Sequence, residues 1–338
     1  MKPFLTYVLF VLLASPGWAQ AIDFADYFED ATMRIDYFHT ANATCDEIAV
    51  DQITINDTWA GNPNRLLPLL ENGRYAIKVV DIASNILLYS RRYLDIVFEY
   101  KGTDAAKEGQ KRTFHQSALM PCPKQRFLFS IERRDKHHRL DAVFSQIIDP
   151  NDRRIKREPA SPMDKSFVIL QNGHPHDCVD LVFVAEGYQT EEFDKFQKDS
   201  QRFADYLFTL EPFGAMKQRF NIHGVFRASA QSGVDIPGER IYKNTVVDAS
   251  YDTFGSGAYV TVFDNKTLRD IAGKVPYDHV IVLANTDKYG GSGFYNSYTL
   301  FTADNARSAE IFTHEFGHGF AGLADEYIAE SCCFGKAA

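Results

Sequence analysis

The chain has 338 residues, of which 45% are hydrophobic and 24% are charged. This is the balance of an ordinary globular protein, and the length is sufficient for two domains with cores of their own. The formal net charge of -9 argues against nucleic acid or an anionic membrane surface as a partner, and it fits a soluble exported protein.

The first 21 residues have the pattern of a signal peptide, and we assign residues 1–21 to it. Lys2 supplies the positive start, and the apolar run at 4–14 is too short to span a bilayer. Small residues at Ala19 and Ala21 offer sites for cleavage. Since no later segment is apolar for long enough to cross a membrane, we expect a secreted or periplasmic protein with no stable membrane anchor.

Residues 22–148 are expected to form an all-β domain. Alternating apolar and polar residues predict strands at 74–81, 87–90, 95–100, 111–116 and 126–133, with turn residues between them. Many short strands separated by turns are typical of a β-sandwich. The histidines of this part are scattered, so we expect no catalytic cluster in it.

The chain has five cysteines, an odd number, so at least one is unpaired or pairs between chains. Export permits disulfides, and Cys45 with Cys122 is a possible pair within the first domain. Cys332 and Cys333 are adjacent and therefore poorly placed to share one metal ion.

Residues 149–165 are charged and contain prolines, which indicates a linker. The second domain, 166–338, alternates strands and helices. Strands are predicted at 179–184, 220–226 and 279–284, and helices after Thr190, as N-cap, and at 268–272. This alternation predicts a mainly parallel sheet with helices packed on it.

The segment 287–305 precedes the most informative part of the chain. Residues 289–293 are glycine-rich and predict a flexible loop, whereas 294–301 predict a strand. One interpretation is an edge strand that pairs with an extended peptide substrate. The alternative is an ordinary sheet edge.

Residues 314–318 read H-E-x-x-H. Residues four apart lie on the same face of a helix, so His314 and His318 can hold one metal ion. Imidazole nitrogen is a preferred zinc ligand, and a catalytic zinc has three protein ligands. Glu315 then lies where a carboxylate can take a proton from water.

The third ligand must come from beyond this helix. Gly322 is a natural end for the helix, because glycine accepts the left-handed conformation of a C-cap. Asp325 follows three residues later, the spacing from glycine to ligand that metzincin sites have. We predict Asp325 as the third zinc ligand and keep Glu326 as the alternative. Both residues could instead simply cap a turn.

The sequence HEFGHGFAGLADEY at 314–327 resembles the zinc signature of the secreted IgA metallopeptidase family, metallopeptidase family 64. Two further sets of stretches are similar to that family: 34–40 with 59–63, and 185–188 with 211–213 and 219–221. The resemblance implies a β-rich N-terminal domain followed by an α/β zincin-like, metzincin-type peptidase domain. It does not identify immunoglobulin as the substrate.

No methionine follows the predicted zinc helix, although metzincins have a Met-turn beneath the metal. The chain also ends soon after Tyr327, whereas members of the resembled family continue further. We therefore expect a chain that is truncated or frame-shifted at its C-terminus, with an incomplete cleft and doubtful activity.

These observations favour a secreted zinc metalloendopeptidase acting on a polypeptide, such as a host glycoprotein or an immunoglobulin. Zn²⁺ would be bound by His314, His318 and Asp325, with Glu315 as general base and Tyr327 as a candidate to stabilise the oxyanion. One rival is a non-catalytic binding protein that uses the β domain. Another is a zinc amidase acting on small or cell-wall amides.

Overall fold

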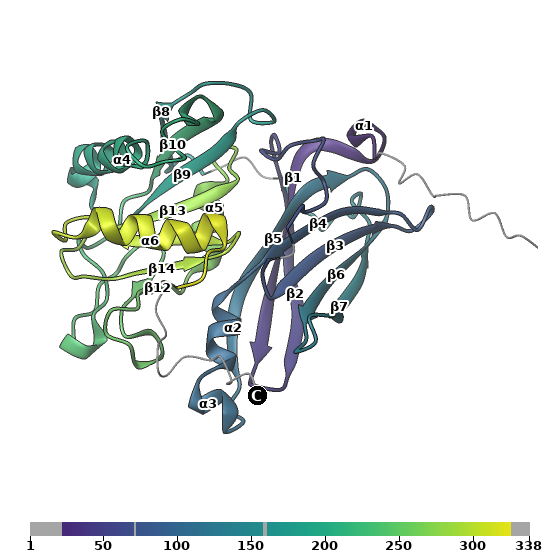
Figure 1. The fold of residues 1–338 in the computed structure, drawn as a ribbon, viewed down its shortest axis with the longest axis horizontal. Helices are drawn as coiled ribbons and strands as arrows, with labels where there is room; N and C mark the ends of the chain where they lie inside the picture. The colour runs from purple at the N-terminus through teal and green to yellow at the C-terminus, as the bar shows by residue number, and fades with distance from the viewer. Residues whose placement is uncertain (1–21, 71, 158–160, 326–338) are drawn as a thin grey trace, which may run out of the picture.

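The computed structural model describes residues 22–70, 72–157 and 161–325. The predicted signal peptide, Glu326, Tyr327, Cys332 and Cys333 lie outside these ranges. Two halves stand side by side, a β-rich N-terminal half and a half in which helices cover a sheet (Figure 1). Among the helices in the described ranges, none has the length and hydropathy that crossing a bilayer requires.

The N-terminal half contains two antiparallel sheets packed on one core. The first has the order β2–β1–β5, with β1 at Phe28–Ala41, β2 at Asp46–Asn56 and β5 at Arg112–Pro123. The second has the order β4–β3–β6–β7, with β3 at Tyr75–Asp81, β4 at Leu87–Tyr93, β6 at Phe127–Arg134 and β7 at Leu140–Ile148. Alternate residues such as Met33, Ile35 and Tyr37 point inward and pack against the second sheet. Two facing sheets of this kind make the sandwich that the strand pattern predicts.

Residues 95–100, predicted as a strand, instead form the helix α2 (Ile96–Lys101). The side chain of Asp95 accepts a hydrogen bond from the backbone N–H of Phe98 at 3.2 Å, which is the contact of a helix N-cap. A second short helix, α3 (Asp104–Lys107), follows after Thr103 caps it in the same way. The apolar pattern of six residues is too short to separate strand from helix, and here the cap decides.

The cysteine pairing suggested by the sequence is wrong. Cys45, Cys122 and Cys178 are free thiols. Next to Cys45, Asp46 pairs with Ala41 at one end of β1, whereas Cys122 pairs with Glu29 near the other end. Twelve residues of strand separate the two ends, which corresponds to about 40 Å. A disulfide needs Cα atoms within about 7 Å.

The second half is built on a six-stranded sheet with the order β14–β15–β13–β9–β10–β8. The strands are β8 (Lys165–Leu170), β9 (Val179–Glu186), β10 (Phe220–Phe226), β13 (His279–Ala284), β14 (Gly291–Phe294) and β15 (Tyr298–Thr302). The four central strands are parallel and the two edge strands are antiparallel to them, which confirms the predicted mainly parallel sheet.

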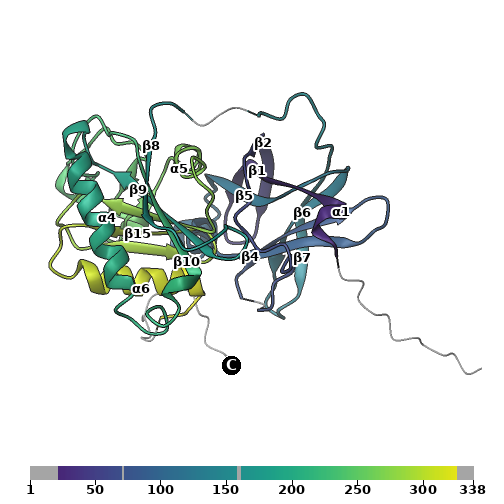
Figure 2. The ribbon, with the colours of Figure 1, turned by 90° about the horizontal axis from the view of Figure 1, so that it is seen from above.

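Helices cover both faces of this sheet. Helix α4 (Phe193–Leu207) and helix α6 (Ser308–Ala321) lie on one face, and α5 (Asn265–Ala272) lies on the other (Figure 2). The remaining short elements are α1 (Phe24–Tyr27), β11 (Ala249–Ser250), β12 (Thr261–Val262) and 3-10 turns at Thr190–Glu192, Lys217–Arg219, Pro237–Glu239 and Thr253–Gly255. Thr190 is not the N-cap of α4, because a 3-10 turn precedes that helix and the Glu192 carboxylate accepts from the N–H of Gln189 at 2.8 Å.

Alternate residues of the central strands enter two different cores. Phe183 of β9 joins the phenylalanine-rich core beneath α4 and α6. Val182, its neighbour, faces the other way and joins a core that also contains Leu268 of α5. That second core includes Val97 of α2 and Phe114 of β5, so the N-terminal half supplies part of it. The two halves of the chain therefore share one apolar core.

Polar contacts also cross between the halves. The guanidinium of Arg34 on β1 contacts the carboxylate of Asp270 on α5 at 2.5 Å. Nearby, Asn265 Nδ2 donates to Ser117 Oγ on β5 at 3.0 Å. The first sheet of the N-terminal half therefore lies directly against α5.

Because the core is shared, destabilising one half should destabilise the other. Leu268 is completely buried, and we expect Leu268→Ala to lower the free energy of unfolding by about 2–5 kcal/mol. Its effect should appear equally in Trp59 fluorescence, which reports on the N-terminal half, and in far-UV circular dichroism of the whole chain. Leu69→Ala is the control, since this side chain is 80% exposed and its loss should change stability by less than about 0.5 kcal/mol. An unchanged Trp59 midpoint in Leu268→Ala would mean that the halves unfold independently.

Candidate metal centre

Helix α6 carries the H-E-x-x-H residues and is anchored by its aromatic face. Phe312 and Phe316 are buried against the sheet, and Phe316 stacks on Phe320 with ring centroids 4.8 Å apart. The helix ends as predicted at Gly322, which adopts the left-handed conformation with φ of 66°. Its N–H donates to the carbonyl of His318 at 3.0 Å. The other side of the helix is thereby left for His314 and His318.

The segment before α6 differs from the prediction. Residues 289–293 were expected to be a flexible loop and 294–301 one strand, but Gly291–Phe294 is the edge strand β14. The chain turns at Asn296, whose φ is 55°, and returns as β15. The Ser297 N–H donates to the Phe294 carbonyl at 2.8 Å and closes this turn. The glycines do not form a loop here. They lie in the strand where α6 packs against it, and their lack of a side chain permits that contact.

Helix α6 lies so close to the hairpin that side chains are excluded at the contact. A Cβ on Gly293 would lie 2.2 Å from the carbonyl oxygen of Glu315, and a Cβ on Gly291 would lie 2.6 Å from Cγ of Glu315. On the helix side, a Cβ on Gly319 would lie 2.3 Å from Thr299 Oγ1. Real Cβ atoms do not approach other atoms this closely, so glycine at these positions permits the packing.

The structure brings together the three residues predicted to bind the metal. His314 Nε2 and His318 Nε2 are 3.0 Å apart, and Asp325 Oδ1 lies 3.3 Å from the first and 3.2 Å from the second. Their side chains are 32%, 18% and 44% exposed, respectively, so the cluster opens to solvent. Within the described ranges, this is the one group of three or more such residues whose donor atoms converge.

The donor atoms fit a zinc ion. His318 Nδ1 lies 2.7 Å from the carbonyl oxygen of Leu323, so Nδ1 carries the proton and Nε2 presents its lone pair to the cluster. Tetrahedral zinc with bonds of about 2.0–2.1 Å separates neighbouring ligand atoms by about 3.3 Å. The spacings in the cluster are close to this value, and two imidazoles with one carboxylate are a ligand set that zinc accepts.

Glu315 lies between the two histidines in sequence and is half-buried beside β14. Burial, together with the negative charge of Asp325, raises the pKa of Glu315 to about 8. A cation held by the neighbouring cluster would favour the ionised carboxylate and act against both effects. The side chain can therefore either hold or release a proton near neutral pH.

The N-terminal half contributes an acidic group that sequence reasoning missed. Glu99 lies on α2, and burial with the nearby charge of Asp325 raises its pKa, whereas His318 acts in the opposite direction. Because α2 was expected to be a strand in a part without site residues, nothing in the sequence placed Glu99 near the metal cluster.

A buried histidine supports α6 from below. His279 Nε2 and Thr299 Oγ1 are 2.9 Å apart, and Thr299 Oγ1 lies 3.4 Å from the Glu315 carbonyl. Burial lowers the pKa of His279 to about 3, so the ring is neutral. It contacts the rings of Phe316 and Phe320 edge-on. His279 is part of the support of the helix and does not face the cluster.

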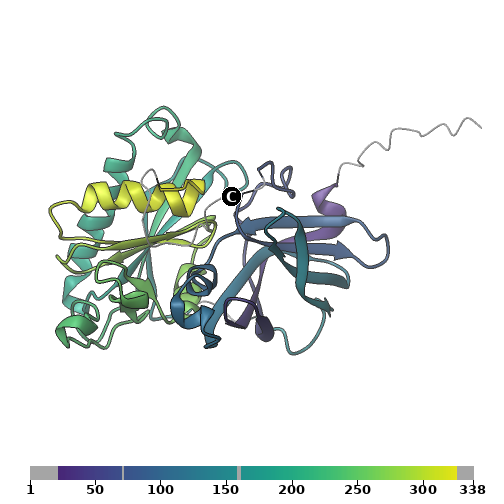
Figure 3. The same ribbon diagram turned by 60° about the horizontal axis from the view of Figure 1, so that its bottom comes forward.

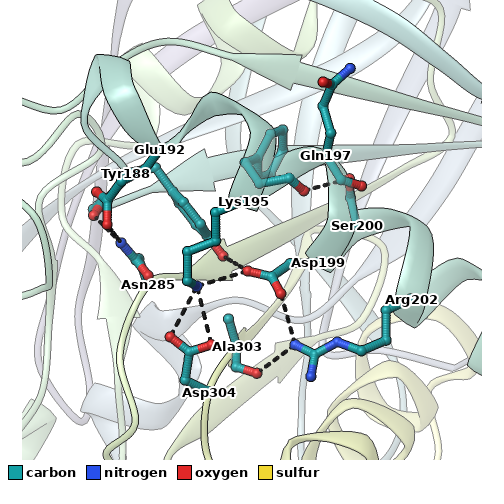
Figure 4. A network of polar contacts seen from close by, with 12 residues as sticks. Tyr188, Glu192, Lys195, Gln197, Asp199, Ser200, Arg202, Asn285, Ala303 and Asp304 are labelled. Carbon is teal, nitrogen blue, oxygen red and sulfur yellow. Dashed lines mark hydrogen bonds and ion pairs between the residues drawn. The ribbon is translucent and has the colours of Figure 1, made fainter.

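The segment that leads to α6 is held by polar contacts from α4 (Figure 4). Lys195 contacts Asp199 at 2.8 Å and Asp304 at 2.9 Å. Arg202 donates to the carbonyl of Ala303 at 2.9 Å. Residues 303 and 304 lie a few positions before α6, so this network holds the segment that leads to the helix, and Gly322 ends the helix.

The close packing predicts different effects for the same change at two neighbouring positions. Gly319→Ala should lower the free energy of unfolding by about 1–3 kcal/mol, because the new methyl group meets Thr299. Gly317→Ala is the matched control. There the nearest atom to a new Cβ is 3.5 Å away, so the higher helix propensity of alanine should add up to about 1 kcal/mol. Urea unfolding would measure both, and equal effects would contradict the packing argument.

Comparison with known families accounts for both halves of the chain. The family model for IgA Peptidase M64 matches residues 167–335, and the model for the Peptidase M64 N-terminus matches residues 23–145. Among curated proteins, none matches the chain. The two matched regions correspond to the helix-covered sheet with its candidate metal centre and to the β-rich half beside it. The chain belongs to the IgA peptidase M64 family.

Proposed function

We propose that this peptidase is a secreted zinc metalloendopeptidase with a zincin-like catalytic half. The observation that carries the proposal is the convergence of His314, His318 and Asp325 on one point, with donor atoms 3.0–3.3 Å apart. Membership of a peptidase family implies a polypeptide substrate. Export rests on the predicted signal peptide at 1–21. We also propose the division into a β domain at 22–148, a linker at 149–165 and a peptidase domain at 166–338.

The chemistry follows from the positions of the side chains. A zinc ion bound by the three ligands supplies a Lewis acid that polarises a carbonyl group and makes water more acidic. Glu315 takes the proton from the attacking water and then donates it to the leaving amide nitrogen. The first transfer needs the ionised carboxylate, which a cation on the three ligands would favour against the burial and the Asp325 charge that raise the pKa of Glu315. Tyr327, the candidate to stabilise the oxyanion, stays a prediction because it lies outside the described residues.

The edge strand β14 supports an extended polypeptide as substrate, although over a shorter length than the sequence suggested. The N–H of Gly291 already donates to the Ala258 carbonyl at 3.4 Å, so that part of the edge is covered. In an antiparallel ladder alternate residues direct their N–H and C=O the same way, so Gly293 presents its own to the same edge. Gly293 lies next to Glu315. We propose that the substrate backbone pairs at Gly293.

Replacing the general base should separate catalysis from metal binding. Glu315→Gln should retain zinc, because the three ligands are unchanged, and should hydrolyse casein about 10²–10⁴-fold more slowly. Elemental analysis and a casein digest with and without chelator measure the two properties. His318→Ala is the control that should lose both zinc and hydrolysis.

Each of the rivals predicts a different result in the same assay. Glu315→Gln that cleaves casein as fast as the wild type would contradict the mechanism. A wild type that binds zinc and cleaves only small or cell-wall amides would indicate an amidase. A wild type with neither zinc nor hydrolysis would favour a binding protein.

The third ligand can be tested by itself. Asp325→Ala should weaken zinc binding by more than about 100-fold, because loss of a direct ligand costs more than the 10–100-fold typical of residues that only orient ligands. Competition with a chromophoric chelator measures the dissociation constant. Glu326→Ala is the matched control and should bind zinc like the wild type. If the two results are exchanged, Glu326 is the ligand.

A further inference from the structure

The turn between β14 and β15 lies between the N-terminal half and the candidate metal centre. Asn296 occupies the left-handed conformation in this turn, and Tyr295 precedes it. Figure 3 shows the C-terminal end of α6 directed toward the N-terminal half, with the hairpin beneath it. Each of the two residues contacts the end of β4 in the N-terminal half and the C-terminal end of α6.

On the side of the N-terminal half, the turn is bound to the end of β4. Asn296 Nδ2 donates to the carbonyl of Arg92 at 2.7 Å, and Arg91 Nη2 donates to Asn296 Oδ1 at 3.3 Å. The N–H of Leu94 donates to the carbonyl of Tyr295 at 2.9 Å. Three hydrogen bonds thus join residues that are about 200 positions apart in the chain.

On the side of the metal centre, the same turn completes the end of α6. The backbone N–H of Asn296 donates to the Gly319 carbonyl at 2.8 Å. The Gly319 carbonyl lies in the last turn of the helix, where carbonyl groups lack a helical N–H partner. The N–H of Leu323, which would bond to it in a longer helix, donates to the Gly317 carbonyl. The ring of Tyr295 lies against Gly322, where a Cβ would be 2.9 Å from it.

The last turn of α6 carries His318, and the segment that follows the helix carries Asp325. His318 precedes Gly319, and the chain turns at Gly322 so that the Leu323 carbonyl meets His318 Nδ1 and Asp325 reaches the cluster. His314 lies one turn earlier. A shift of this end of the helix would therefore move His318 and Asp325 relative to His314.

Asparagine suits the linking position for a physical reason. A residue with φ of 55° is normally Gly, Asn or Asp, and of these only asparagine offers both a side-chain donor and an acceptor. Asn296 uses the donor on Arg92 and the acceptor on Arg91 while its own N–H holds Gly319.

We propose that Asn296 is a positioning residue through which the N-terminal half holds the metal centre in its binding geometry. The inference rests on the proposed zinc function and adds that the β-rich half is part of the working site. The N-terminal half then acts indirectly, since the contacts of Asn296 are with Arg91, Arg92 and Gly319, and the Gly319 carbonyl lies next to His318 in the chain.

Asn296→Gly tests the inference cleanly. Glycine keeps the left-handed backbone and the N–H bond to Gly319 but deletes both side-chain bonds to β4. In the full chain, we expect the zinc dissociation constant to rise about 10-fold, the effect typical of residues that orient ligands, and kcat on casein to fall while KM changes less than about 2-fold. Asn85→Gly is the matched control, because Asn85 has φ of 57° and lies in the turn between β3 and β4. It should behave like the wild type.

A second variant and a metal-free measurement keep the test decisive. Asn296→Asp retains an acceptor for Arg91 and should lose less zinc affinity than Asn296→Gly. In the metal-free chain, Asn296→Gly should speed hydrogen exchange at the Gly322 and Leu323 amides, and Asn85→Gly should not. Unchanged zinc affinity and exchange in Asn296→Gly, even with a lower unfolding midpoint, would overturn the inference. Faster exchange in a chain whose wild type binds no zinc would support the link and refute the proposed function.

Discussion

The close approach of α6 to β14 is the contact on which the candidate site depends. Helix and edge strand meet at Gly291 and Gly293 of β14, and Gly319 of the helix lies against Thr299 of the neighbouring strand β15. The helix backbone therefore approaches the sheet edge directly. This contact places Glu315 beside the edge strand, where a polypeptide could pair, and it fixes the rotation of the helix that turns His314 and His318 outward. The phenylalanines on the other face of α6 provide the burial that holds it there. The local geometry of the site is thus a property of backbone packing, and the polar side chains occupy the space that it leaves.

Three sets of contacts support the helix that carries the candidate site. Below α6, the neutral ring of His279 contacts the rings of Phe316 and Phe320 and lies 2.9 Å from the hydroxyl of Thr299. Ahead of it, the Lys195 contacts fix the approach to the helix. Beyond its end, the turn at Asn296 joins it to β4. His279 is a residue type common in catalytic sites, but here it is buried, neutral and packed beneath α6, so its role is structural.

The sequence predicted the geometry of the H-E-x-x-H helix better than it predicted the structure around it. His314 and His318 share a helix face because they are four residues apart, and Gly322 ends the helix because glycine accepts the left-handed conformation. Both features could therefore be predicted from a short stretch of sequence. The parallel strands of the second half are continuous apolar runs and were also predictable. The helix at Ile96–Lys101 and the strand at Gly291–Phe294 were not. The first is a helix because the Asp95 side chain caps it, although its short apolar pattern also fits a strand. The second is a strand whose glycines are packed against α6, which comes later in the chain. The same holds for Glu99 and Asn296, whose neighbours lie some 200 residues away.

The shared core has a consequence for how this family could diversify. The family models divide the chain into an N-terminal and a peptidase region, yet Val97 and Phe114 of the first pack in one core with Leu268 and Val182 of the second. A recombination that joined the N-terminal region of one relative to the peptidase region of another would bring together two faces shaped for different partners. The unit that evolution can exchange without repacking is then the pair of regions, and new specificities would arise more readily in loops at the periphery than by swapping either region whole.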